Sequence, residues 1–331
     1  MQKVLGLSDL IRLLSSELPP TTGQALAEFL ENQPELFVGG CQMKCGALEM
    51  LSNQAAKTQS NGVPSSTYEW LSNAAAWFYT QNVASFDSDF ANVLVKTSFD
   101  KDFDLNCIKR FEGNPIYIPL EKPCECKLGS HASFSKDTGT FLGVVVSVES
   151  TSQNWATMIY FNFLLISKFV DRDNTDWAVS NFLVATRDGE SFSIDKFLQS
   201  FKTFVLDDEG VAKEIIEKLV YLLSDEPEAI EWRHEVLGFV PQIRKHKRRA
   251  STIYAPRQPR VKRFGEAFGT EIRQASAAKG TDRSVRPHIR SAHWHTYLVG
   301  EGRTKRVIRW LKPIFVHSRQ AEPSSTRIPA Y

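Results

Sequence analysis

Between residues 114 and 185 the sequence carries four short runs of β-branched and aromatic residues, and these runs restrict the fold more than any other feature. They cover residues 116–118, 141–146, 158–163 and 177–184. Such residues fit the pleated surface of a strand, whereas the Gly, Pro, Asp and Asn residues that separate the runs form turns. We therefore expect a central, mostly antiparallel sheet.

The segments on either side of these runs show helical periodicity. After them, apolar residues recur at helical spacing over 211–223 and stop near Pro227. Before them, the same spacing occurs in segments that begin at Ser8 and after Gly23, cover 42–54, follow Thr67 and cover 87–95. This order predicts the α+β class, with an N-terminal helical layer over 1–100, a sheet-rich part over 114–200 and a helix over 210–224.

The composition is that of an ordinary globular protein. Of the 331 residues, 42% are hydrophobic and 24% are charged, which excludes a disordered or collagen-like chain. The longest apolar run, over 156–170, is interrupted by Asn162 and Lys168, and the five cysteines are an odd number that fits reduced thiols. We expect a cytoplasmic protein with no membrane partner.

Charge is distributed very unevenly along the chain. Residues 1–240 hold 19 Lys and Arg against 33 Asp and Glu, a net charge of −14, whereas residues 241–331 hold 21 against 5, a net charge of +16. Basic segments bind nucleic acid by neutralising phosphates, although this one could instead fold back on the acidic part. We expect an acidic body over 1–240, a basic linker over 241–262 and a basic module over 263–331.

The basic module contains a predicted β-hairpin. Residues 288–298 and 306–316 both favour strands, and Gly300 and Gly302 lie at the turn between them. Because successive side chains of a strand alternate between its two faces, His293, His295 and Tyr297 share one face and Trp294 lies on the other with Arg290.

The sequence of this hairpin is compatible with several functions. The interpretation we favour is RNA binding, with arginines on phosphates and aromatic rings on bases. Acid-base cleavage of RNA by His293 and His295 is an alternative, a metal site lacks nearby acidic or cysteine ligands, and both indoles could simply be core. The candidate RNA-binding residues are Arg286, His288, Arg290, His293, Trp294, His295, Tyr297, Arg303, Arg306, Arg309 and Trp310.

Several familiar active-site motifs are absent from the sequence. It contains no Gly-Lys-Ser/Thr phosphate loop and no Gly-x-Ser-x-Gly nucleophile elbow. The pair Gly265 and Gly269 lacks the third glycine and the downstream acid of a dinucleotide site. The sequence therefore predicts neither a nucleotide cofactor nor a serine hydrolase.

The C-terminal region resembles a known family. The motifs are RPHIRSAHWHTY over 286–297, Gly300-x-Gly302, RW-x-x-P-x-FV over 309–316, and the earlier GE-x-x-G-x-E-x-R over 265–273. In these motifs the chain is similar to the plasmid- and phage-borne anti-CRISPR family of type V-A, which suppresses biogenesis of the type V-A effector nuclease. Ser291 and Ala292 depart from the family pattern.

The resemblance implies a function. Members lower the mRNA and protein of the effector in a translation-dependent way by recognising the N-terminal part of the nascent effector polypeptide, and no metal or nucleotide cofactor is implied. The expected partners are that polypeptide and RNA or the ribosome, with Trp70, Trp77 and Trp232 as candidates for an aromatic peptide groove in the acidic body. The alternatives are a metal-independent ribonuclease and a DNA-binding plasmid maintenance protein.

Overall fold

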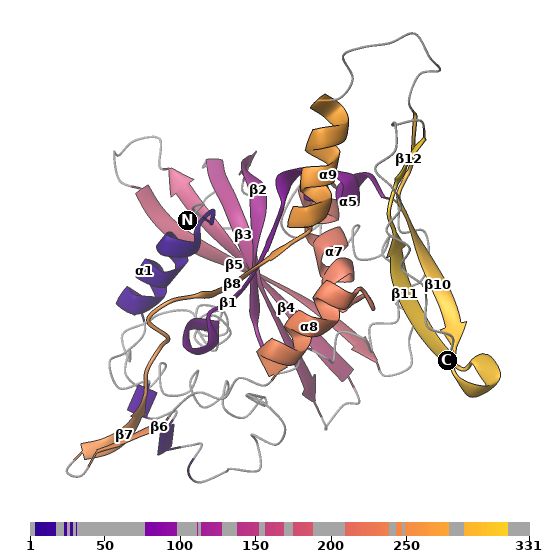
Figure 1. Cartoon of the computed structure of the whole chain (residues 1–331). Coiled ribbons are helices and arrows are strands. Elements are labelled where there is room, and N and C mark those ends of the chain that lie inside the picture. Colours follow the sequence, from indigo (N-terminus) through magenta and orange to yellow (C-terminus); the bar gives the residue numbers. More distant parts are fainter. Residues whose placement is uncertain are drawn as a thin grey trace.

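The computed structural model of the chain is built around one sheet with helices on both sides (Figure 1). The structure describes residues 4–17, 23–24, 27–28, 31, 77–97, 111, 114–127, 138–151, 156–168, 175–187, 209–237, 243–246, 249–277 and 288–316.

The central sheet has six strands in the order β5-β4-β3-β2-β1-β8. The four strands that come from the β-rich part of the sequence pair antiparallel, whereas β1 is parallel to both β2 and β8. The sheet is mixed but mostly antiparallel, and with the helices around it the α+β prediction is confirmed. The strands are β1 (Asn82–Phe86), β2 (Ile116–Lys127), β3 (Thr138–Thr151), β4 (Ala156–Lys168), β5 (Thr175–Arg187) and β8 (Arg260–Phe264).

The N-terminal part is not wholly helical. Helices α1 (Leu7–Glu17) and α5 (Ser88–Lys96) lie where helices are predicted, but β1 between them is a buried strand. Its hydrogen-bonded neighbours are β2 and β8, which come from distant parts of the chain, and five residues are too few to show a period of their own. The helix predicted over 42–54, and most of the one after Thr67, fall outside the described residues.

Strands also occupy the segment for which the sequence predicts a basic linker. Strand β6 (Ile243–His246) pairs antiparallel with β7 (Arg249–Ile253), and β8 pairs with β1 along its whole length. The basic residues of β8 make it difficult to predict as a strand from the sequence. Phe264 is buried, but the side chains before it are only half-buried, and the ammonium of Lys262 lies 3.5 Å from the carboxylate of Glu231. These parts of the predicted linker therefore form strands, whereas its place as a boundary between an acidic body and a basic module stays a prediction.

The two faces of the sheet support separate cores. On one face, α1 packs with Trp77 over Val83, Tyr117 and Val145. On the other face lie α5, α7 (Glu209–Leu223), α8 (Pro227–Leu237) and α9 (Glu266–Ala277), as Figure 1 shows. Helix α7 confirms the helix predicted over 210–224. None of the helices in the described part of the chain is long and apolar enough to cross a membrane.

The predicted C-terminal hairpin is confirmed. Strand β10 (His293–Val299) pairs antiparallel with β11 (Lys305–Leu311), and β9 (His288–Arg290) pairs with β12 (Ile314–Val316). Gly300 and Gly302 have φ of 83° and 67° in the connecting turn, a left-handed conformation that glycine adopts without strain. The hairpin lies against the outer side of the helices (Figure 1), and the backbone N–H of Asp225 donates to the carbonyl of Ile308 over 2.9 Å.

Candidate functional site

One side of the hairpin presents a row of exposed side chains, as the alternation of the sequence predicts. His293, His295 and Tyr297 are exposed on β10, while Trp294 between them is half-buried. The rings of His295 and Tyr297 meet edge-on with centroids 4.4 Å apart. Arg309, which faces His295 across the ladder, places its guanidinium carbon 6.0 Å from the centre of the Tyr297 ring. We call these four residues the hairpin face.

The indoles of the hairpin point the other way, into the helical layer. Trp310 is 4% exposed and packs edge-on against Phe90 and Phe268, with ring centroids 5.1 and 5.2 Å apart. The Nε1 of Trp294 donates to the carboxylate of Glu217 over 2.9 Å. Trp310 therefore belongs to the core and offers no surface on which a base could stack. The sequence allowed this alternative, in which the indoles of the hairpin are core residues.

The other candidate RNA-binding residues are only partly described. Arg303 is exposed in the turn of the hairpin. The backbones of His288, Arg290 and Arg306 lie in β9 and β11, opposite Val316, Ile314 and Leu298, but their side chains are not among those described. Arg286 lies outside the described residues altogether.

The histidines of the hairpin face lie on an open surface. His293 and His295 are both exposed on a strand, and neither lines the cavity described below. Within the described ranges, no group of three or more His, Cys, Asp or Glu side chains converges to hold a metal ion. The hairpin face is suited to contact a ligand rather than to enclose one.

The tryptophans proposed for a peptide groove are core residues where they are described. Trp77 is fully buried, and its Nε1 donates to the carbonyl of Asn82 over 2.8 Å. Trp232 is 2% exposed and packs against Phe264 at 5.3 Å between ring centroids. Trp70 lies outside the described residues. Trp77 and Trp232 fill the core and leave no side-chain surface for a peptide.

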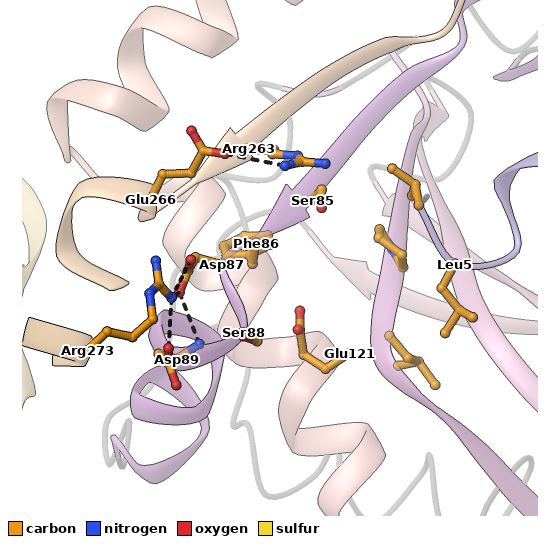
Figure 2. A pocket seen from close by; sticks show the side chains of 13 residues that line it. Leu5, Ser85, Phe86, Asp87, Ser88, Asp89, Glu121, Arg263, Glu266 and Arg273 are labelled. Carbon is orange, nitrogen blue, oxygen red and sulfur yellow. Dashed lines mark hydrogen bonds and ion pairs between the residues drawn. The ribbon is translucent and has the colours of Figure 1, made fainter. Parts of the chain in front are cut away.

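A cleft of about 410 Å³ lies instead where β1 and β8 end. Because these two strands are parallel, α5 and α9 begin side by side at the same edge of the sheet. Figure 2 shows the charged side chains of Asp87, Glu266 and Arg273 on one side and Leu5 on the other. The cleft is lined by Val4, Leu5, Ser85, Phe86, Asp87, Ser88, Asp89, Pro119, Leu120, Glu121, Arg263, Glu266 and Arg273.

Ion pairs fix the charged side of the cleft. Asp87 caps α5 by accepting hydrogen bonds from the backbone N–H groups of Asp89 and Phe90. From α9, the Nη1 of Arg273 reaches the carboxylates of Asp87 and Asp89 at 3.0 and 2.7 Å. Arg263 pairs with Glu266 at 3.5 Å. Each arginine of the lining is therefore turned toward a carboxylate (Figure 2).

A buried lysine orients the remaining carboxylate. The Nζ of Lys218, a fully buried residue, lies 3.1 Å from Glu121, 2.7 Å from Glu214 and 2.9 Å from the carbonyl of Pro119. Burial raises the pKa of Glu121, and the Lys218 ammonium partly opposes that shift. Four carboxylates against two guanidinium groups leave the lining of the cleft with an excess of negative charge.

Two glycines allow α9 to approach α5 at the cleft. Gly265 has φ of +74°, and a Cβ there would collide with the ring of Phe90. A Cβ on Gly269 would collide with the carboxylate of Asp87. Both glycines and Arg273 belong to the motif over 265–273. In the sequence, only that motif points to the cleft. The sequence does not show that the motif lies beside Asp87, because this depends on the pairing of β1 with β8.

Comparison with known proteins identifies the family of the chain. A family model described as "AcrVA2-like: Anti-CRISPR type V subtype A2 family" matches residues 84–318. The chain belongs to this family. The AcrVA2-like match begins in β1 and ends beyond β12, and it therefore includes the whole hairpin and most of the cleft lining.

A solved structure supports the fold of this AcrVA2-like chain. The "Crystal structure of AcrVA2" is similar at a TM-score of 0.53, with 14% sequence identity, over 94% of this chain and 97% of that one. At this identity the likeness shows a shared fold. A search of curated proteins found no match.

Proposed function

We propose that this AcrVA2-like protein lowers the mRNA and protein of a type V-A effector nuclease in a translation-dependent way. In this proposal it recognises the N-terminal part of the nascent effector polypeptide, while its basic C-terminal part contacts RNA or the ribosome. The observation that supports this best is that one fold carries two separate surfaces: none of the residues lining the anionic cleft belongs to the hairpin.

The cleft is the proposed binding site for the peptide. Its carboxylates offer ion pairs to a terminal amine or a lysine, while Leu5 and Leu120 offer contacts to an apolar side chain. About 410 Å³ is the size of an ordinary ligand pocket and accommodates a few residues of a peptide. Ion pairs and the cap of α5 already fix the side chains on the charged side of the cleft. These side chains therefore lose little conformational entropy when a peptide binds.

The hairpin provides the proposed contact with RNA or the ribosome. Residues 288–316 contain six Lys and Arg and a single acid, Glu301. Arg303 and Arg309 are exposed on it. A peptide reader that acts during translation needs its target and the ribosome at the same time, and surfaces on separate elements allow both contacts.

A reporter experiment tests the proposal. The coding segment for the effector N-terminus is fused upstream of a neutral reporter, and a matched reporter carries the same segment shifted by one base, which changes the peptide but hardly the RNA. We expect this protein to lower the mRNA of the first reporter only. Equal loss from both reporters, or no loss from either, would overturn peptide recognition.

The same system separates binding from catalysis. Under the proposal, purified protein leaves a purified transcript intact when no cell extract is present. Cleavage of that transcript by the protein alone, abolished by His293→Ala, would instead establish the ribonuclease alternative.

A further inference from the structure

We infer that the hairpin face binds single-stranded RNA by stacking bases on the rings of Tyr297 and His295. The inference rests on the proposed contact with RNA or the ribosome and specifies the chemistry of that contact. It concerns His293, His295, Tyr297 and Arg309, the four residues of the hairpin face.

The first argument is the accessibility and spacing of the rings. Tyr297 is 38% exposed although its ring already contacts His295, and His293 is exposed two residues before His295. The Cα atoms of His293 and His295 are about 7 Å apart along the strand, whereas the rings of His295 and Tyr297 meet with centroids 4.4 Å apart and together offer a surface for one base. Successive nucleotides of an extended single strand match the spacing between His293 and His295, as in the RNA-binding sheets whose aromatic residues stack two or three bases.

The second argument is the position of the positive charge. The guanidinium carbon of Arg309 lies over the ring of Tyr297, 6.0 Å from its centre, and the positive charge is therefore within reach of the phosphate of a base stacked on that ring. Arg303 in the turn and Lys312 after β11 are also exposed. Arg309 is the cation at the rings, and Lys312 places its ammonium group 5.9 Å from the centre of the Phe268 ring, on the side of the helices. Arg309 can therefore contact the phosphate of a stacked base. Glu301, the one acid of the hairpin, is exposed in the turn.

The geometry favours a single strand over the other polyanions. In a duplex the faces of the bases are covered by their neighbours, which leaves only phosphate contacts for this surface. The apolar side chains Leu298 and Val299 are exposed near the turn and would suit a protein partner. However, the rings and the guanidinium group that make up the hairpin face are the groups that recognise bases and phosphates.

The test uses the full-length protein and a fluorescently labelled oligouridylate of about a dozen nucleotides, which has little structure of its own. Fluorescence anisotropy measures the dissociation constant at low and at physiological salt, with a self-complementary RNA duplex for comparison. We expect Tyr297→Ala to weaken binding of the oligouridylate by about fivefold or more, and Tyr297→Phe, which keeps the ring, by less than twofold.

Tyr254 provides a matched control. It is 51% exposed, and the guanidinium of Arg244 lies 5.2 Å from its ring centre, which is the same pair of groups outside the hairpin face. We expect Tyr254→Ala to leave binding within twofold of the unchanged protein. A loss as large as that of Tyr297→Ala would overturn the assignment to the hairpin face.

Two further outcomes would contradict the inference. Duplex bound as tightly as oligouridylate, with no effect of Tyr297→Ala, would mean that the surface contacts phosphates only. Binding to purified ribosomes without binding to either RNA would mean that it contacts a ribosomal protein or folded ribosomal RNA. Neither result changes the outcome expected of the reporter experiment. Failure of this inference can therefore be distinguished from failure of the proposed function.

Discussion

Trp294 on the inner side of the hairpin donates a hydrogen bond from its indole Nε1 to the Oε2 of Glu217 on α7, over 2.9 Å. Glu217 is 3% exposed, and this carboxylate therefore lies in the interface between hairpin and helix. Because neighbours on a strand alternate, fixing Trp294 inward turns His293 and His295 outward. The contact thus determines which side of the hairpin faces solvent.

Replacing Trp294 with Phe should destabilise the protein. A six-membered ring still packs on the core, but the N–H donor to a buried carboxylate is lost with the rest of the indole, and the loss of the donor alone costs about 1–3 kcal/mol. Urea denaturation measures this as a fall in the free energy of unfolding. The loss should be smaller in a Glu217→Gln background, where the acceptor is neutral. An equal loss in both backgrounds would show that the hydrogen bond does not hold the hairpin.

Replacing Gly269 with Ala separates helix propensity from packing. In an unobstructed helix the change would stabilise by about 1 kcal/mol. Here the added Cβ collides with the Asp87 carboxylate that caps α5, and we expect a net loss of about 1–3 kcal/mol instead. The melting temperature of the variant measures the sign of the effect. Gln274→Ala, at an exposed position of α9, should stay close to the unchanged protein.

Glu226 should make stability fall as pH rises. Burial raises its pKa above the usual 4.5, against the opposing effects of the Trp310 backbone N–H, Lys312 and Arg309. Between 4.5 and the raised value, the folded state binds more protons than the unfolded state, and the free energy of unfolding therefore decreases with increasing pH through that window. Glu121 contributes in the same direction.

Thermal melts from about pH 5 to about pH 7 test this. Glu226→Gln keeps an acceptor for the Trp310 N–H but no longer titrates, and its melting temperature should fall less across the range than that of the unchanged protein. Glu271→Gln removes one exposed carboxylate from α9 and should keep the full pH dependence. If both variants follow the unchanged protein, Glu226 does not govern this dependence.

Local patterns explain which parts of the fold the sequence predicts. Alternation over 293–297 predicts which side chains share a face of β10, since a strand has a fixed period of two. Helix α5 is predictable for a similar reason, with its cap at Asp87 and apolar residues on one side. Both are decided within a few residues of the chain.

The rest depends on contacts between distant segments. Strand β8 carries Arg260, Lys262 and Arg263, and without β1 and α8 beside it the segment resembles a solvated linker. The cleft follows from the same pairing, which brings Arg273 to Asp87 across 186 positions of the chain. Trp310 shows the opposite difficulty, because an indole among arginines suits RNA binding and core packing equally well in the sequence.

The cleft itself gives the last prediction. Glu266 lines it, and replacing Glu266 with Lys exchanges a carboxylate for an ammonium group at the rim. If the cleft holds a cationic peptide, this charge reversal should weaken binding of a synthetic effector N-terminal peptide by roughly fivefold at low salt, and by less at high salt, because salt screens exposed charges. Fluorescence polarisation of the labelled peptide measures both values.

Glu271 on the same helix supplies the control for this reversal. It is exposed and lies outside the cleft lining, and Glu271→Lys therefore changes the net charge by the same amount without touching the proposed site. We expect Glu271→Lys to bind the peptide and silence the reporter as the unchanged protein does, and Glu266→Lys to be weaker in both assays. Equal weakening by the two variants would mean that the peptide responds to overall charge, and the peptide site would then have to lie elsewhere.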